Sequence, residues 1–130
     1  MLIRVSFKNL LSFDRQETIS FVAGKTHSHQ DHVVSGSGRN DPGILKTALV
    51  YGANASGKSN LIKCFDIMRN LILVGTRSDE AIKRVPFKLR KEASSEPSSF
   101  EIEIKVDKEV YAYSASFTDR EIIEERLTLV

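Results

Sequence analysis

The sequence predicts a mixed α/β fold in which strands precede and follow one glycine-rich turn and its helix. Two patterns indicate this. After the turn, apolar residues recur with helical spacing in the stripe Leu61, Phe65, Met68 and Ile72. After Pro86, apolar and polar residues alternate with the period of two that is typical of strands. With 130 residues, 41% of them hydrophobic, the chain can form one domain with its own core.

The first 43 residues are predicted to form two strands and a long loop. Residues 2–7 and 18–22 mix β-branched and aromatic residues with polar ones, and a turn at Asn9 and residues 12–15 separates them. Residues 23–43 hold several glycines and all 3 histidines without apolar periodicity, which predicts a loop. A loop of this length in a compact domain is often functional.

The middle of the chain predicts a buried strand, a turn and a helix. Residues 45–51 form a short apolar run, which residues 52–57 interrupt. The helix follows directly, and Gly75 is expected to end it. Phe65 and Met68 on this helix are interpreted as core residues rather than as cofactor contacts.

The last part of the chain, from about residue 96 to residue 130, predicts an antiparallel β-meander. Residues 100–106 alternate so that one face is apolar and the other polar. A turn at residues 107–108 leads into strands at 110–117 and 122–130, and such short connections favour antiparallel pairing. The final strand has no polar tail, so we expect the sequence to be part of a longer fold.

Composition excludes several classes of protein. The formal net charge of +2 gives no strong preference for nucleic acid or membranes. A single cysteine, Cys64, excludes an internal disulfide framework and fits a reducing cytoplasm. The apolar run at residues 71–74 is too short to span a bilayer, and no signal-peptide pattern opens the chain. We therefore expect a cytoplasmic chain without a membrane segment.

Residues 52–59 match the P-loop pattern of two glycines separated by four residues and followed by Lys and Ser. Glycines let successive backbone N–H groups turn toward an anionic triphosphate, and the helix N-terminus adds its free N–H groups and its dipole. Lys58 is expected to reach the β- and γ-phosphates, and the Ser59 hydroxyl to bind Mg²⁺. The expected cofactors are therefore ATP and Mg²⁺. The candidate nucleotide-binding residues are Gly52, Asn54, Ala55, Ser56, Gly57, Lys58, Ser59 and Asn60, with Ser59 also the candidate metal ligand.

The alternative interpretation is a glycine-rich turn with a solvated lysine, but the apolar run before it and the helix after it favour the P-loop.

Hydrolysis of ATP also needs an acidic residue after a second buried strand and a group that orients water. No run of four apolar residues is followed by Asp or Glu, because residues 71–74 precede Gly75 and only two apolar residues precede Glu124. We therefore assign no catalytic residue and expect the chain alone to bind nucleotide but hydrolyse it poorly or not at all.

The motif resembles the N-terminal lobe of ABC-type ATPases of the SMC, RecF and OLD group, through the sequence Gly-Ala-Asn-Ala-Ser-Gly-Lys-Ser-Asn-Leu at residues 52–61. Residues 8–13 are similar to the Asn-Phe-Arg-Ser-Phe that this group often has, but Leu11 replaces the arginine, so a phosphate contact there is not carried over. The resemblance implies an α/β fold of the P-loop NTPase class, with β-strands, the P-loop helix and an antiparallel meander. Three residues go beyond the minimal P-loop: Asn54, Ser56 and Asn60.

A closer resemblance is to bacterial AAA-15-type ATPases of phage-defence and abortive-infection systems. Tyr51 to Asn60, Glu96 to Glu101 and the tyrosine-bearing residues 111–113 carry it. It covers nearly the whole chain but only the first lobe of the family's domain, whose signature loop, Walker B acidic pair and switch histidine follow further on. Residues 35–38 are similar to a signature loop but precede the P-loop, so they are interpreted as a flexible loop.

The resemblance implies that ATP lies between two subunits, so that the protein is a homo-oligomer through its ATP site. It also implies a link to DNA or to an effector nuclease in phage defence or DNA repair. Two other hypotheses remain open. One is an autonomous P-loop kinase or transferase, and the other is a non-catalytic interaction module with a relic P-loop.

Two weaker groups of side chains have competing interpretations. His27, His29 and His32 lie near Asp31 and could bind a metal such as Zn²⁺, although a solvated polar loop is favoured because no scaffold fixes their geometry. The basic residues within 83–91 could contact nucleic-acid phosphates, although acidic neighbours favour a solvated face.

Tyr111 and Tyr113 could stack on a base, but their alternation along the chain is explained more simply by one face of a sheet.

Overall fold

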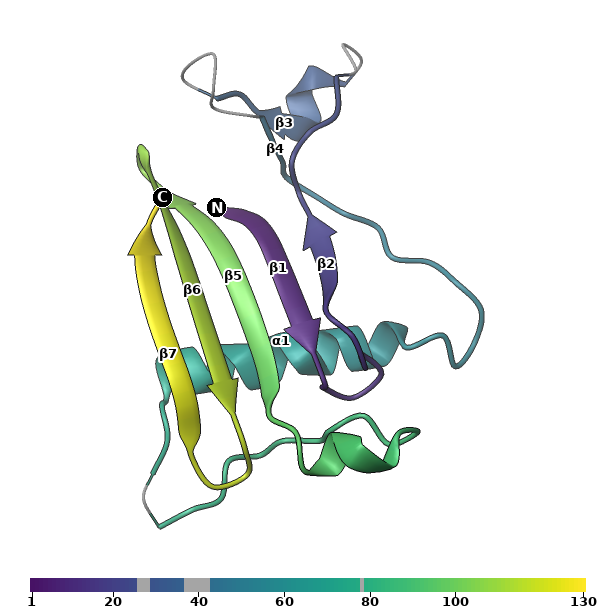
Figure 1. The fold of residues 1–130 in the computed structure, drawn as a ribbon. Helices are drawn as coiled ribbons and strands as arrows, with labels where there is room; N and C mark the ends of the chain where they lie inside the picture. The colour runs from purple at the N-terminus through teal and green to yellow at the C-terminus, as the bar shows by residue number, and fades with distance from the viewer. Residues whose placement is uncertain (26–28, 37–42, 78) are drawn as a thin grey trace.

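The computed structural model describes residues 1–25, 29–36, 43–77 and 79–130 (Figure 1). Its main body is a five-stranded antiparallel sheet in the order β2-β1-β5-β6-β7, with the helix α1 (Lys58–Leu73) lying across one face (Figure 1). The expected mixed α/β fold is therefore confirmed, with a sheet that is wholly antiparallel. The strands of this sheet are β1 (Leu2–Lys8), β2 (Glu17–Ser20), β5 (Ser98–Val106), β6 (Glu109–Phe117) and β7 (Ile122–Leu129).

Strands β5, β6 and β7 form the predicted meander, and their register is continuous. Ser98 pairs with Phe117 at one end of the β5–β6 ladder, and Val106 pairs with Glu109 at the other. The two-residue turn between them places Asp107 at a φ of 54°, the left-handed conformation that tight hairpins need and that Asp tolerates. β1 then pairs with β5, which joins the two ends of the sequence in one sheet.

The core lies between α1 and the covered face of the sheet. Val5 and Phe7 from β1 pack there with Phe117 from β6, and all three are almost completely buried. The ring of Phe7 meets that of Phe65 edge to face, with 5.4 Å between centroids. Phe65 is partly buried, and Met68 is only 5% exposed, so both belong to the core as expected.

The buried stripe of α1 differs from the predicted one at its C-terminal end. Ile72 is 43% exposed, whereas Cys64, which was not counted in the stripe, is completely buried. The face that packs on the sheet is Leu61, Cys64, Met68 and Leu71, a spacing of three and four residues that moves Ile72 toward solvent. The helix ends as predicted.

The end of α1 is a glycine cap. Gly75 adopts a φ of 75°, and its N–H donates to the carbonyl of Asn70 at 3.3 Å. A glycine in the left-handed region after the last turn is the usual way to satisfy the last carbonyls of a helix.

The prediction of a buried strand over residues 45–51 is wrong. Only Ile44–Leu45 form a strand, β4, and beyond it Leu49 is 87% exposed and Tyr51 94% exposed. A buried strand needs neighbours that satisfy its N–H and C=O groups on both sides. No described strand pairs with residues 46–51, so their apolar side chains remain on the surface.

The segment predicted as a long loop contains some regular structure in its described part. A 3₁₀ turn, η1 (Gln30–His32), leads into β3 (Val33–Val34), which pairs with β4 in a separate two-stranded sheet. The second predicted strand is shorter than expected, because β2 ends at Ser20 and Val22 makes only an isolated bridge to Ile44. A second 3₁₀ helix, η2 (Lys91–Ser94), precedes β5.

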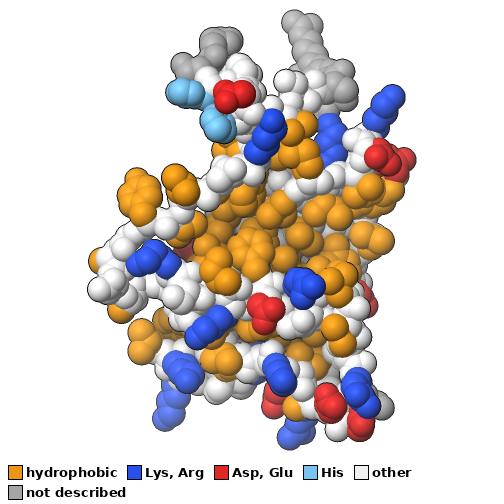
Figure 2. Space-filling model, turned by 180° about the vertical axis from the view of Figure 1, so that it is seen from behind, with side chains coloured by type: hydrophobic (Ala, Val, Ile, Leu, Met, Phe, Trp, Pro, Cys, Tyr) orange, Lys and Arg blue, Asp and Glu red, His pale blue; other side chains and the backbone are white. Residues whose placement is uncertain are grey.

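Hydrophobic side chains remain visible on the side of the sheet that carries α1 (Figure 2). On β7, Leu127 is 68% exposed and Leu129 59% exposed. The helix therefore covers only part of the apolar face. None of the helices in the described residues is long and apolar enough to cross a membrane.

Candidate functional site

Residues 52–57 form the turn that leads into α1, and its backbone needs glycine at one position. Gly57 is the N-cap of the helix, with a φ of 94° that L-residues with side chains rarely adopt. A Cβ on Gly57 would also lie 3.3 Å from the Cβ of Ser12. Ala55 adopts a φ of 65° in the same turn, a left-handed conformation that costs conformational free energy in a residue with a side chain.

The start of α1 offers unpaired donors. The first helical bond runs from the N–H of Leu61 to the carbonyl of Gly57 at 2.9 Å, so the N–H groups before Leu61 have no partner within the helix. The N-cap makes no side-chain hydrogen bond, and the first turn contains no acidic residue. An anion placed here would meet free N–H groups and the positive end of the helix dipole.

Lys58 folds back over the turn. Its Nζ donates to the carbonyl of Gly52 at 2.8 Å and to that of Ala53 at 2.7 Å. The ammonium group therefore lies above the loop, beside the N-terminus of α1. An entering phosphate could replace the two carbonyls as the acceptor, because it carries full charge.

The other predicted site residues lie around this turn. Asn54, Ala55 and Ser56 are exposed in the loop, and Ser59 is exposed in the first turn of α1. A serine hydroxyl can ligate Mg²⁺. Asn60 is half-buried. All eight predicted residues therefore lie in the turn at 52–57 or in the first turn of α1.

Ser12 is a residue of this site that sequence reasoning missed. Its Oγ accepts a hydrogen bond of 2.7 Å from Nδ2 of Asn60. The turn between β1 and β2 therefore lies against the P-loop. Residues 8–13 are similar to a motif of the resembled group, and this similarity was the signal in the sequence for the contact. From the sequence, we used the similarity only to note that Leu11 replaces the arginine of that motif.

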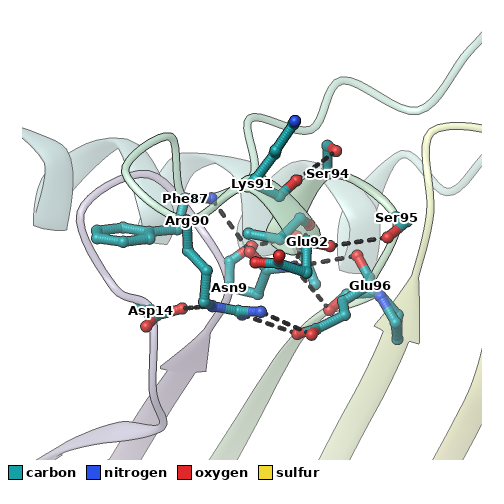
Figure 3. Close-up of polar contacts among 12 residues, drawn as sticks. Asn9, Asp14, Phe87, Arg90, Lys91, Glu92, Ser94, Ser95 and Glu96 are labelled. Atoms are coloured by element: carbon teal, nitrogen blue, oxygen red, sulfur yellow. Dashed lines mark hydrogen bonds and ion pairs between the residues drawn. The ribbon is translucent and has the colours of Figure 1, made fainter.

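Asn9 holds the β1–β2 turn against the segment before β5 (Figure 3). This completely buried side chain accepts from the N–H of Phe87 at 3.1 Å and donates to the carbonyl of Ala93 at 2.8 Å. Its φ of 48° is in the left-handed region that Asn adopts more readily than most residues. The hydroxyl of Ser98 also donates to the carbonyl of Asn9.

Arg90 joins the same two segments through charge (Figure 3). Its Nε donates to Asp14 at 2.8 Å, and its two Nη atoms donate to Glu96 at 2.6 and 2.8 Å. These hydrogen bonds raise the pKa of the Arg90 guanidinium above its usual value. The hydrogen bond from Arg90 also lowers the pKa of Glu96.

The predicted basic cluster therefore divides into two kinds of residue. Arg90 is engaged in these ion pairs, and Arg84 donates to the carbonyls of Glu96 at 2.6 Å and Ser94 at 2.8 Å. Lys83, Lys88 and Lys91 are exposed. Both arginines thus stabilise the segment before β5, which sequence reasoning did not anticipate.

The histidine group is brought together only in part. Ligand atoms of His29, Asp31 and His32 lie within 4.8 Å of one another, and all three residues are exposed. His27 lies outside the described residues. Lys46 steadies this turn by donating from Nζ to the carbonyl of Asp31 at 2.7 Å.

The two tyrosines of β6 lie on the sheet. The ring of Tyr113 packs on Phe100 with 5.9 Å between centroids, and its hydroxyl donates to Glu125 at 2.6 Å. Burial, together with Glu125, raises the pKa of Tyr113 to about 12. The hydroxyl of Tyr111 donates to Glu109. Both tyrosine side chains thus have partners within the sheet, in line with the simpler interpretation.

A glycine-rich turn that opens a helix with Gly-Lys-Ser, beside a β-sheet, defines the class of P-loop nucleotide-binding domains. The family model described as "AAA domain, putative AbiEii toxin, Type IV TA system" matches residues 48–129. This match covers more than half of the chain, and the chain belongs to this family of AAA domains. No curated protein and no solved structure matches the chain. Membership of an AAA family implies nucleotide binding, typically with Mg²⁺.

Proposed function

We propose that the chain is the ATP-binding lobe of an ABC/SMC-like ATPase in which ATP drives dimerisation and so controls a partner effector, in phage defence or DNA repair. The observation that carries the ATP-binding part is the start of α1. There Gly57 is left-handed, the first N–H groups lack helical partners, and Lys58 lies over the loop.

Each part of the proposed ATP site has its own role in binding. The backbone N–H groups of the turn and of the first turn of α1 surround the phosphates. Lys58 exchanges the carbonyls of Gly52 and Ala53 for the β- and γ-phosphates. The hydroxyl of Ser59, in the first turn of α1, would hold Mg²⁺, and the ion would supply positive charge beside the phosphates.

Hydrolysis requires more than this lobe supplies. A magnesium-binding acid and a group that orients water must meet the γ-phosphate. Such an acid is expected after a second buried strand, and no run of four apolar residues in the sequence is followed by Asp or Glu. We therefore expect the 130-residue chain on its own to bind ATP and to hydrolyse it poorly.

Exposure of the P-loop supports the dimer part of the proposal. The loop from Gly52 to Ser56 is exposed along its whole length, which leaves bound phosphates open to a second subunit. Light scattering after size-exclusion chromatography tests this: a non-hydrolysable ATP analogue with Mg²⁺ should raise the molar mass of the wild type but not of Lys58→Ala. An unchanged mass in both would remove the dimer from the proposal.

The test of ATP binding is isothermal titration calorimetry with Mg-ATP. Lys58→Ala should weaken binding at least about tenfold, because a charged donor to the phosphates is lost. Lys108→Ala, which removes an exposed lysine in the β5–β6 turn, is the matched control and should bind as the wild type does. Folded protein that binds no nucleotide would favour the relic P-loop, and phosphoryl transfer by the chain alone would favour the kinase.

A further inference from the structure

An open cleft of about 700 Å³ adjoins the P-loop. One wall is the P-loop itself with Asn60 of α1. The other wall is formed by Leu11 and Ser12 of the β1–β2 turn and by the segment from Val85 to Leu89. The cleft thus lies where three stretches of the chain, far apart in sequence, come together.

Hydrogen bonds tie these three stretches to one another. The N–H of Leu11 donates to the carbonyl of Val85 at 2.7 Å, and Asn60 reaches Ser12 as described above. The N–H of Phe87 is held by the side chain of Asn9. Leu11 has a φ of 54°, an uncommon conformation for leucine that persists only where the surroundings impose it. The cleft is therefore a built feature rather than a gap between loose loops.

The position of the cleft relative to the phosphates is informative. Lys58 and Ser59 serve the β- and γ-phosphates in a P-loop. The rest of the nucleotide must leave the loop along a neighbouring surface. Ala55 and Ser56 of the P-loop and Asn60 of α1 all line the cleft, which makes it continuous with the phosphate site.

The chemistry of the lining suits a nucleoside. Leu11, Val85 and Phe87 give it apolar walls, and Lys63 and Lys88 add positive charge, while none of the described residues that line it is acidic. Ligand sites combine apolar walls with a few polar groups in this way. A nucleobase has a flat π-face for stacking on an aromatic ring, and its phosphates carry the negative charge that the lysines favour.

We propose that this cleft holds the base and ribose of the bound nucleotide, with Phe87 and Leu11 as the walls that contact the base. The proposal rests on the proposed function, because it needs the triphosphate in the P-loop. It assigns a ligand role to Leu11, the position at which the chain departs from the arginine of the resembled group.

The test compares two ligands that differ only in the nucleoside. Calorimetry measures the binding of Mg-ATP and of Mg-tripolyphosphate to the 130-residue chain. Wild type should bind Mg-ATP more tightly. Phe87→Ala should weaken Mg-ATP binding about 5- to 100-fold, the usual range for losing a stacked base, and leave Mg-tripolyphosphate binding unchanged. Ile123→Ala, which truncates an exposed apolar side chain on β7, is the control and should change neither.

The outcomes separate this proposal from the proposed function. Equal affinity of the wild type for the two ligands, or equal weakening of both by Phe87→Ala, would overturn the base cleft. Loss of both ligands in Lys58→Ala would still support the P-loop. Binding that Lys58→Ala leaves intact would instead remove the proposed function.

A second measurement needs no variant and so does not depend on folding of Phe87→Ala. Photolabelling of the wild type with 8-azido-ATP, followed by peptide mapping, should mark residues 85–89 or the turn at Leu11, and excess ATP should prevent it. ATP-protected labelling confined to β5–β7 would contradict the proposal.

Discussion

Nδ2 of Asn60 lies 2.7 Å from Oγ of Ser12, and this hydrogen bond connects the first turn of α1 to the turn between β1 and β2. Asn60 and Ser12 are 48 residues apart in sequence. The bond therefore fixes the P-loop helix to the first hairpin of the sheet at the point where the candidate nucleotide site begins.

Removing either partner of this bond should destabilise the folded protein. Ser12→Ala and Asn60→Ala are each expected to cost about 0.5–1.5 kcal/mol of stability, the usual net value of one hydrogen bond. Chemical denaturation of the two variants and the double variant measures their coupling. The double variant should cost less than the sum of the single ones. Strict additivity would show that the bond contributes nothing in solution.

Gly57→Ala should destabilise the protein. The φ of 94° is unfavourable for alanine by about 1–2 kcal/mol, and the new Cβ would press on Ser12 at 3.3 Å. Gly24→Ala is the matched control, because a Cβ at Gly24 meets no atom within 4 Å. Denaturant midpoints of the two variants provide the comparison. Equal midpoints would contradict the assignment of strain to Gly57.

The ion pairs of Arg90 predict how stability depends on pH. Because the hydrogen bond from Arg90 lowers the pKa of Glu96 below its ordinary value of 4.5, this carboxylate stabilises the folded protein above that pH, and the contribution is lost as pH falls through the lowered value. Wild type should therefore lose more stability than Arg90→Met on acidification below about pH 4.5. Thermal melting at pH 7 and pH 3 measures the difference.

The control for that experiment is the exposed pair of Arg126 and Glu124, which are 69% and 62% exposed. Surface pairs of this kind contribute little. Arg126→Met should therefore follow the wild-type pH profile. If Arg90→Met also followed it, the link between Arg90 and Glu96 would not act in solution.

Cys64 should be unreactive in the folded protein. It is completely buried, and burial raises the pKa of its thiol to about 12, so the reactive thiolate is scarce at neutral pH. The chain has 1 cysteine, so a colorimetric thiol reagent reports on it alone. At pH 8 the native protein should react far more slowly than protein unfolded in guanidinium chloride. Equal rates would mean that α1 does not stay packed on the sheet.

Local pattern was enough to predict the elements that satisfy their own backbone groups or those of a sequence neighbour. The helix at α1, its end at Gly75 and the β5–β6–β7 meander were predicted because helical spacing, a glycine cap and short turns are all local signals. The strand predicted over residues 45–51 was wrong because that prediction also used only local pattern. Its apolar pattern indicates that the segment suits the interior of a sheet. The pattern does not indicate which strand would pair with it.

The sequence by itself determined the motif of the candidate site, since Gly57, Lys58 and Ser59 are contiguous and their role depends on local backbone geometry. Only the tertiary structure decided that β1 inserts between β2 and β5, that Asn9 and Arg90 hold the segment before β5, and that Ser12 meets Asn60. These contacts join residues tens of positions apart. Which of many possible partners a buried amide or a guanidinium finds depends on how the whole chain packs, and no periodicity in the sequence records it.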